Sequence, residues 1–181
     1  MQPFVELQVG SGLRGVTKLR WREWPTRTWL SWTLAGIFIA AAVFTCYLLA
    51  PPANELPSWV HTVRLIGGGV LVLMVAVRLL MEATVSKPRP GEVPAGDRKL
   101  MDPWWSTIHT STGVVLGLWL IPFLVVAILT VLWEVVETSV PGFGDEEING
   151  NRMFDILLAW TGWLVAAVII AWGSGVPLPV I

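Results

Sequence analysis

The sequence predicts an all-α, polytopic membrane protein with four transmembrane helices in one bundle and both termini in the cytoplasm. Of its 181 residues, 54% are hydrophobic and only 14% are charged, and the mean hydropathy is +0.66. So little charge cannot cover the surface of a soluble domain of this size. The chain also contains several apolar runs of about 20 residues, the length at which a helix crosses a bilayer.

The first span is predicted at residues 28–50 and ends at Pro51 and Pro52, because proline cannot continue a helix. The second covers residues 59–81. The third, residues 106–136, is the longest and contains Pro122. We predict one tilted and kinked helix there, with two shorter helices or a re-entrant segment as the alternatives. The fourth covers residues 153–172. A transmembrane domain, 28–173, thus follows a leader, 1–27, and precedes a short tail, 174–181.

Basic residues predict the orientation. They gather in the leader and in the connection between the second and third spans: Arg14, Lys18, Arg20, Arg22, Arg27, Lys87, Arg89, Arg98 and Lys99. The other two connections contribute only Arg152, with Arg64 just inside the second span. Basic connections stay in the cytoplasm, which predicts a multi-pass protein of the inner membrane. The leader also alternates Trp with basic residues and could lie on anionic lipid. Membrane lipids are therefore the expected partners, and nucleic acid is not.

Ionisable residues from three spans are predicted at the outer membrane level. They are Glu134 and Glu137, Arg152 and Asp155, and His61 and Arg64. Such groups are costly near hydrocarbon and usually have a partner or a task. A spacing of three places each pair on one helical face. Glu134 could then form an ion pair with Arg64, and Glu137 with Arg152, across the bundle. The alternative is solvated carboxylates, with Arg152–Asp155 a surface pair worth under about 1 kcal/mol.

No metal site and no cofactor is predicted. The loop from Asp145 to Glu147 is at most a weak candidate for a divalent cation. His61 and His109 are expected on opposite sides of the membrane, which excludes a haem held by both. His109 is interpreted as a hydrogen-bonded packing residue. Cys46 is the single cysteine, so an intrachain disulfide is impossible.

Small and aromatic residues predict how the helices pack. Gly67, Gly68 and Gly69, and the pair Gly113 and Gly117, allow close helix contact. That contact lies either within the chain or in a homo-oligomer or a complex with a protein partner. Inside the spans, Trp119, Trp160 and Trp163 are interpreted as packing residues.

One ordered pattern in the second half carries a family resemblance. A glutamate (Glu134 or Glu137) closes one helix, a loop runs through Gly144, and Arg152 and Asp155 open the next helix, which continues as ILLAWTGW. Residues 133–166 resemble the VanZ-like group of small bacterial membrane proteins. That group usually has Asn and a small residue where this chain has Ala159 and Trp160, and a glutamate–glutamine pair at Glu134 and Glu137. The resemblance implies a polytopic protein linked to the cell envelope.

Three functions fit these features. The first is an envelope protein whose outward-facing site, formed by the six ionisable residues, binds a lipid headgroup or a lipid-linked envelope precursor. The second is a structural or accessory subunit of a larger membrane complex. The third is a hydrolase or transferase with Glu134 or Glu137 as general base. A transporter would have to oligomerise, because four spans are few.

Overall fold

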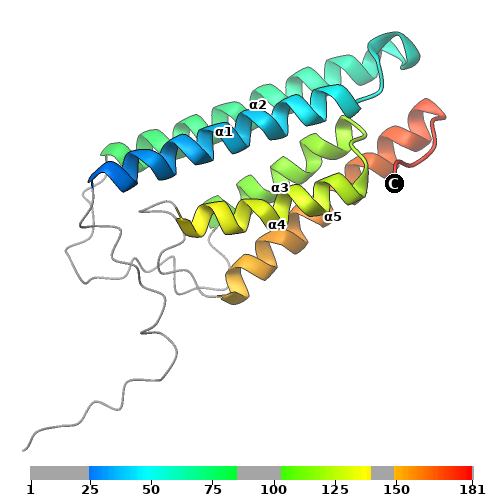
Figure 1. The fold of residues 1–181 in the computed structure, drawn as a ribbon. Coiled ribbons are helices and arrows are strands. Elements are labelled where there is room, and N and C mark those ends of the chain that lie inside the picture. Colours follow the sequence, from blue (N-terminus) through cyan, green and yellow to red (C-terminus); the bar gives the residue numbers. More distant parts are fainter. Residues whose placement is uncertain (1–24, 85–102, 140–148, 181) are drawn as a thin grey trace, which may run out of the picture.

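The computed structural model describes residues 25–84, 103–139 and 149–180, and every regular element in them is a helix (Figure 1). Five are α-helices: α1 Pro25–Leu49, α2 Ser58–Thr84, α3 Pro103–Leu118, α4 Phe123–Ser139 and α5 Asn149–Ser174. A short 3-10 helix, η2 Ala53–Glu55, lies between α1 and α2. The all-α prediction is confirmed. Two stretches, Ser58–Met81 and Gly150–Ser174, are long and apolar enough to cross a membrane.

Successive helices alternate in direction, so the bundle has two distinct ends (Figure 1). At one end, which we call the cluster end because the ionisable side chains described below meet there, α1, α3 and α5 begin and α2 and α4 finish. At the opposite end, which we call the turn end, lie the α1–α2 connection, the residues between α3 and α4, and the last described residues. The described chain therefore starts and finishes at opposite ends of the bundle, whereas four spans would return it to the starting end.

The prediction of one kinked helix over residues 106–136 is wrong, because two helices meet there at a reversal. Leu120 has a φ of 54°, the left-handed conformation that commonly terminates helices. Its N–H donates to Gly117 O (3.0 Å), and the N–H of Ile121 donates to Leu116 O (3.1 Å). Pro122 then starts α4, since its carbonyl accepts from the N–H groups of Val125 and Val126. The proline therefore begins a new helix, as in the two-helix alternative.

Arg64 of α2 holds this reversal. Its Nε donates to Leu118 O (3.0 Å), one Nη donates to Trp119 O (3.1 Å), and the other donates to Pro51 O (3.2 Å). The guanidinium also lies over the Trp119 ring, 5.3 Å from its centroid. The last carbonyls of a helix have no partner within it, and a cation is favoured at that end of the helix dipole. Arg64, which is only 3% exposed, supplies both the hydrogen-bond donors for these carbonyls and the positive charge at the end of the helix.

Helices α3 and α5 run parallel and form the closest contact of the bundle, because glycines line it. A Cβ added to Gly113 would lie 1.9 Å from Ala159 O, and one added to Gly117 would lie 2.4 Å from Trp163 O. On α5, a Cβ at Gly162 would lie 2.4 Å from Thr110 O. Gly113 and Gly117 therefore serve contact within the chain. Around Gly68 and Gly69 of α2, nothing lies within 4 Å of an added Cβ.

Aromatic residues and the tail fill the turn end. Trp163 is 3% exposed, and its indole N–H donates to Ile121 O at 2.8 Å. The Phe123 ring packs against it, with centroids 4.9 Å apart. The N–H of Phe123 donates to Pro179 O at 3.0 Å, which ties the tail to the start of α4. The indole N–H of Trp160 donates to Thr130 Oγ1 at 2.9 Å. These contacts bear out the packing role predicted for Trp160 and Trp163.

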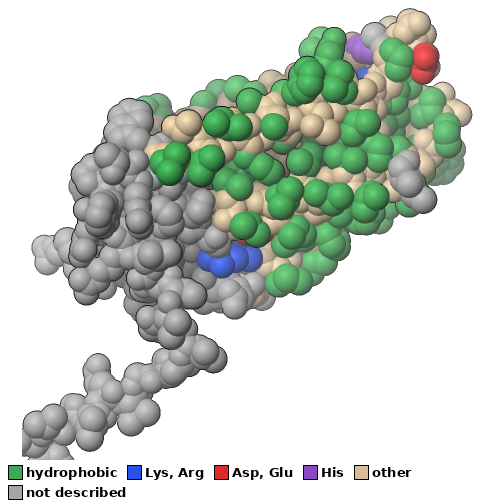
Figure 2. Space-filling view, viewed as in Figure 1, with side chains coloured by type: hydrophobic (Ala, Val, Ile, Leu, Met, Phe, Trp, Pro, Cys, Tyr) green, Lys and Arg blue, Asp and Glu red, His purple; other side chains and the backbone are tan. Residues whose placement is uncertain are grey.

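The outer surface is strongly apolar. Figure 2 shows hydrophobic side chains along the length of the bundle and the few charged ones near its ends. Among the side chains described in α1, Ala35 is the buried one, whereas Val43 and Tyr47 are more than 60% exposed. On α2, Leu65 and Val72 are about 70% exposed. Apolar faces of this extent on a monomer mark contact with lipid or protein.

We expect Gly113→Ala to destabilise the protein by about 1–3 kcal/mol, because the new methyl group would overlap the Ala159 carbonyl of α5. Gly68→Ala is the matched control, since its Cβ meets open space, and it should be neutral or slightly stabilising. Thermal unfolding in detergent, followed by Trp fluorescence, compares the two. Equal unfolding midpoints would contradict the proposed close contact.

We expect Arg64→Met to cost at least about 2 kcal/mol, because it leaves carbonyls at the α3–α4 reversal without their donor. Arg64→Lys should recover only part of this, since one ammonium lacks the spread of a guanidinium. His61→Gln, three residues away on the same helix and half-buried, controls for position. Unfolding by denaturant measures all three, and a stable Arg64→Met protein would exclude the clamp.

Candidate functional site

Four ionisable side chains from three helices meet at the cluster end of the bundle. We call His109 of α3, Glu134 and Glu137 of α4, and Asp155 of α5 the carboxylate–histidine cluster. The exposed fractions are 8% for Glu134, 7% for Glu137 and 1% for Asp155, and the His109 side chain is 13% exposed. Buried carboxylates are rare unless they are paired or bind a cation.

The reversal between α3 and α4 creates this cluster. Helix α3 runs from the cluster end to the turn end, and α4 returns, which brings its last turns back to the level of His109. Glu134 and Glu137, three residues apart, point from one face of α4. Asp155 lies in the second turn of α5, where the positive end of the helix dipole favours a carboxylate. Each helix therefore places its side chain near the same end.

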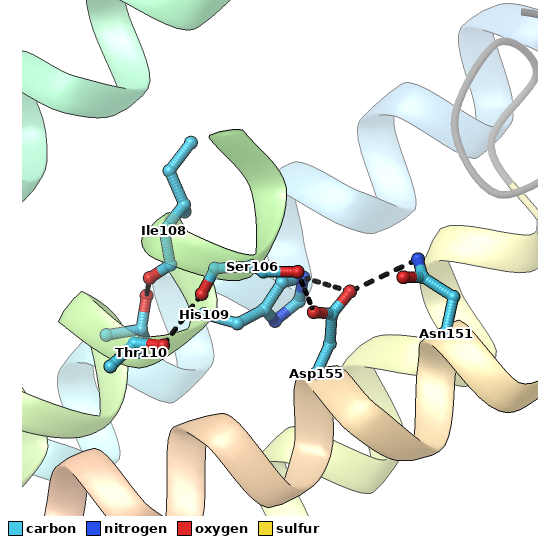
Figure 3. A network of polar contacts seen from close by, with 7 residues as sticks. Ser106, Ile108, His109, Thr110, Asn151 and Asp155 are labelled. Carbon is cyan, nitrogen blue, oxygen red and sulfur yellow. Dashed lines mark hydrogen bonds and ion pairs between the residues drawn. The ribbon is translucent and has the colours of Figure 1, made fainter. Parts of the chain in front are cut away.

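Asp155 is held by hydrogen bonds from two buried neighbours (Figure 3). Ser106 Oγ donates to its Oδ1 at 2.8 Å, and Asn151 Nδ2 donates to its Oδ2 at 3.3 Å. The Nε2 atom of His109 lies 3.8 Å from Oδ2, just beyond hydrogen-bonding distance. Ser106 is 3% exposed and Asn151 is 2% exposed. The carboxylate is thus fixed in orientation with one oxygen toward the imidazole.

His109, Glu134 and Glu137 have the composition and spacing of a metal-ligand set. One nitrogen or oxygen of each lies within 4.8 Å of those of the other two. Ligand atoms about 2.0–2.2 Å from one tetrahedral ion lie roughly 3.4 Å apart, so modest side-chain rotation would bring these three to one ion. Two carboxylates and an imidazole suit a divalent cation, a proton shared between carboxylates, or an organic ammonium group.

The structure brings together some of the predicted site residues and separates others. Glu134, Glu137 and Asp155 meet as predicted, and Arg152 lies half-buried in the first turn of α5. His61 and Arg64 lie at the turn end, which corrects the predicted six-residue site. The Glu134–Arg64 ion pair is also wrong, because Arg64 serves backbone carbonyls there. The Glu137–Arg152 pair stays a prediction, and residues 145–147 lie outside the described chain.

Sequence reasoning missed three members of the site: His109, Ser106 and Asn151. His109 was placed on the side opposite Glu134, because a single helix over 106–136 separates the two residues by its whole length. The signal lay in that length, which well exceeds the about 20 residues that cross a bilayer. Two shorter antiparallel helices joined near Pro122 account for the extra length, and they bring Glu134 of α4 back beside His109 of α3.

The cluster also lies on the other side of the bundle from that predicted. Residues 85–102, which carry Lys87, Arg89, Arg98 and Lys99, join the finish of α2 to the start of α3. Both of those helix ends lie at the cluster end (Figure 1). The leader joins α1 at the same end. The helix ends that adjoin these basic residues in the sequence therefore lie at the same end of the bundle as the carboxylates, whereas the sequence predicted the carboxylates at the opposite end.

We expect Ser106→Ala to destabilise the protein by about 1.5–3 kcal/mol, because the buried carboxylate of Asp155 would lose the hydrogen bond that the Ser106 hydroxyl donates to it. Thr161→Ala removes an exposed hydroxyl that bonds only its own helix, to Leu157 O, and should be close to neutral. Denaturant unfolding in one detergent compares the two, and equal losses would show that the Ser106–Asp155 bond contributes nothing.

Comparison with known proteins adds no assignment. No family model matches the chain, and no curated protein or solved structure matches it. The resemblance of residues 133–166 to the VanZ-like group stays a prediction.

Proposed function

We propose that this is a multi-pass protein of the cytoplasmic membrane whose carboxylate–histidine cluster binds a cationic ligand from the cytoplasmic side. The observation that carries the proposal is the convergence of three buried carboxylates and a histidine from three helices. Helices of such apolar composition rarely contain buried ionisable groups without a function.

The membrane location is supported by the outer surface and by helix length. Helices α2 and α5 contain spans of 24 and 25 residues, and α1 contains a shorter apolar stretch, Thr33–Leu49. Helices α3 and α4, with 16 and 17 residues, reach about 24–26 Å, slightly less than the about 30 Å hydrocarbon core. We infer five alternating membrane helices in place of four, which puts the leader and the tail on opposite sides.

The orientation follows from the basic segments. Residues 1–24 and 85–102 join helices at the cluster end, and basic connections remain in the cytoplasm. We therefore place the cluster toward the cytoplasm, in place of the outward-facing site predicted from four spans. In this arrangement a ligand reaches the cluster from the cytoplasm or from the inner leaflet.

The charge of the cluster indicates the charge of its ligand. Glu134, Glu137 and Asp155 are buried together in surroundings where charges interact more strongly than in water. Such a site favours a cation and disfavours a bare phosphate. A metal ion and the ammonium group of a lipid headgroup share this chemistry, so the polar ligand expected from the sequence is narrowed to a cationic one.

A second candidate, an accessory subunit of a membrane complex, is favoured by one observation. The described part of α1 buries only Ala35, and α2 presents open space beside Gly68 and Gly69. A partner helix could approach closely over these glycines. Native mass spectrometry in gentle detergent decides this point, because a subunit would be recovered with a second protein in fixed stoichiometry.

We expect cations to stabilise the protein through Glu134 and Glu137. A ligand that binds only the folded state adds about 2.7 kcal/mol at a concentration 100-fold above its Kd. Thermal unfolding in detergent is measured at matched ionic strength with magnesium, zinc, ammonium, ethanolamine or phosphate. The wild type is compared with the double variant Glu134→Gln/Glu137→Gln and with Glu55→Gln, an exposed glutamate at the turn end.

At least one cation should raise the unfolding midpoint of the wild type and of Glu55→Gln, and the double variant should lose that response. If phosphate alone stabilises the protein, or if the double variant responds like the wild type, a cation-binding function is excluded. Retention of the response in Glu55→Gln would show that surface charge is not its cause.

A further inference from the structure

We propose that the cationic ligand is a divalent transition-metal ion of the zinc, manganese or iron(II) class, held by His109, Glu134 and Glu137. In this site Asp155 is a positioning residue that orients His109. The inference rests on the proposed cation-binding function and makes its ligand specific.

The identity of the donor atoms favours this class. Calcium and magnesium prefer oxygen ligands alone, whereas imidazole together with carboxylate suits zinc, manganese and iron. His109 contributes such a nitrogen within 4.8 Å of the oxygens of Glu134 and Glu137. A site built only for magnesium would not require this histidine.

The surroundings of His109 resemble those of a metal-bound histidine, although the carboxylate that faces it lies just beyond hydrogen-bonding distance. Such a histidine offers one ring nitrogen to the ion and usually turns the other toward a carboxylate, which fixes the orientation of the ring. Asp155 Oδ2 lies 3.8 Å from His109 Nε2, and Asp155 is itself held by Ser106 and Asn151. A carboxylate on α5, supported by one donor from α3 and one from α5, thus faces the imidazole on α3.

The charges also balance at the ion. Two ionised glutamates and one divalent cation together carry no net charge, and a poorly solvated site tolerates such a unit far better than a net charge. Three protein ligands leave a coordination position for water or for a substrate group, the arrangement found in catalytic zinc sites and absent from closed structural ones.

Metal content after chelation and reloading tests the inference. The purified full chain is stripped with a chelator and offered Zn²⁺, Mn²⁺, Fe²⁺ without oxygen, Mg²⁺ or Ca²⁺. Bound metal per chain is then measured by elemental mass spectrometry, and Kd by competition with a chromophoric chelator. Variants are His109→Gln, Glu134→Gln and Asp155→Asn, with His61→Gln as the matched histidine control at the turn end. Circular dichroism verifies the helical content of each.

We expect one transition-metal ion per wild-type chain, bound at least tenfold more tightly than Mg²⁺ or Ca²⁺. His109→Gln and Glu134→Gln should each weaken binding by tenfold or more. Asp155→Asn should weaken it by about 10–100-fold, the usual effect of removing a carboxylate behind a metal-bound histidine. His61→Gln should bind like the wild type. X-ray absorption of the zinc-loaded wild type should show imidazole among the ligands, a readout that does not depend on any variant folding.

The outcomes separate this inference from the cation-binding function. If magnesium or an ammonium compound stabilises the protein through Glu134 and Glu137, but transition metals bind no better, the metal inference fails and the function stands. If no cation binds, both fail. A zinc-loaded protein without imidazole scattering, or a folded His109→Gln variant with unchanged Kd, would also overturn the metal assignment.

Discussion

The clamp that Arg64 places on the end of α3 is the interaction on which the rest of this structure depends. A buried guanidinium satisfies the carbonyls of Leu118 and Trp119 and joins them to Pro51. This allows the chain to turn back within a few residues, because the buried guanidinium supplies donors that the last carbonyls of a helix lack. Because α4 returns along the bundle, its glutamates meet a histidine that precedes them by 25 residues or more in the chain.

The glycines between α3 and α5 determine how closely the site is assembled. With Gly113 and Gly117 facing Ala159 and Trp163, the two backbones approach until Ser106 Oγ reaches Asp155 at 2.8 Å. Larger residues at these positions would separate the helices and break that hydrogen bond. The polar site therefore depends on the close packing, because the glycines of α3 bring the two helices near enough for their short polar side chains to meet.

Much of the fold could be predicted from the sequence, because apolar length and proline position are local signals. The first helix and its end before Pro51 were such cases. The sequence also placed Glu134, Glu137 and Asp155, the three carboxylates of the cluster, near the ends of neighbouring helices. The reversal could not be predicted in this way, since helices that finish in a left-handed residue usually signal this with glycine, and here Leu120 takes that role, buried at 2% exposure. Nor could the sequence distinguish an arginine that pairs with glutamate from one that caps a helix. An arginine can serve either role, and only the position of Arg64 of α2 relative to the end of α3 shows that it caps the helix.

The hydrogen bond from Phe123 to Pro179 has a consequence for how the molecule is made. The N–H of Phe123, in the first turn of α4, bonds to the carbonyl of Pro179, which is synthesised only after all of α5. Until then the hairpin of α3 and α4 lacks both its tail contact and the Trp163 indole that donates to Ile121 O. The hairpin is therefore incomplete during synthesis, and the polar site takes its final shape only when α5 packs alongside α3.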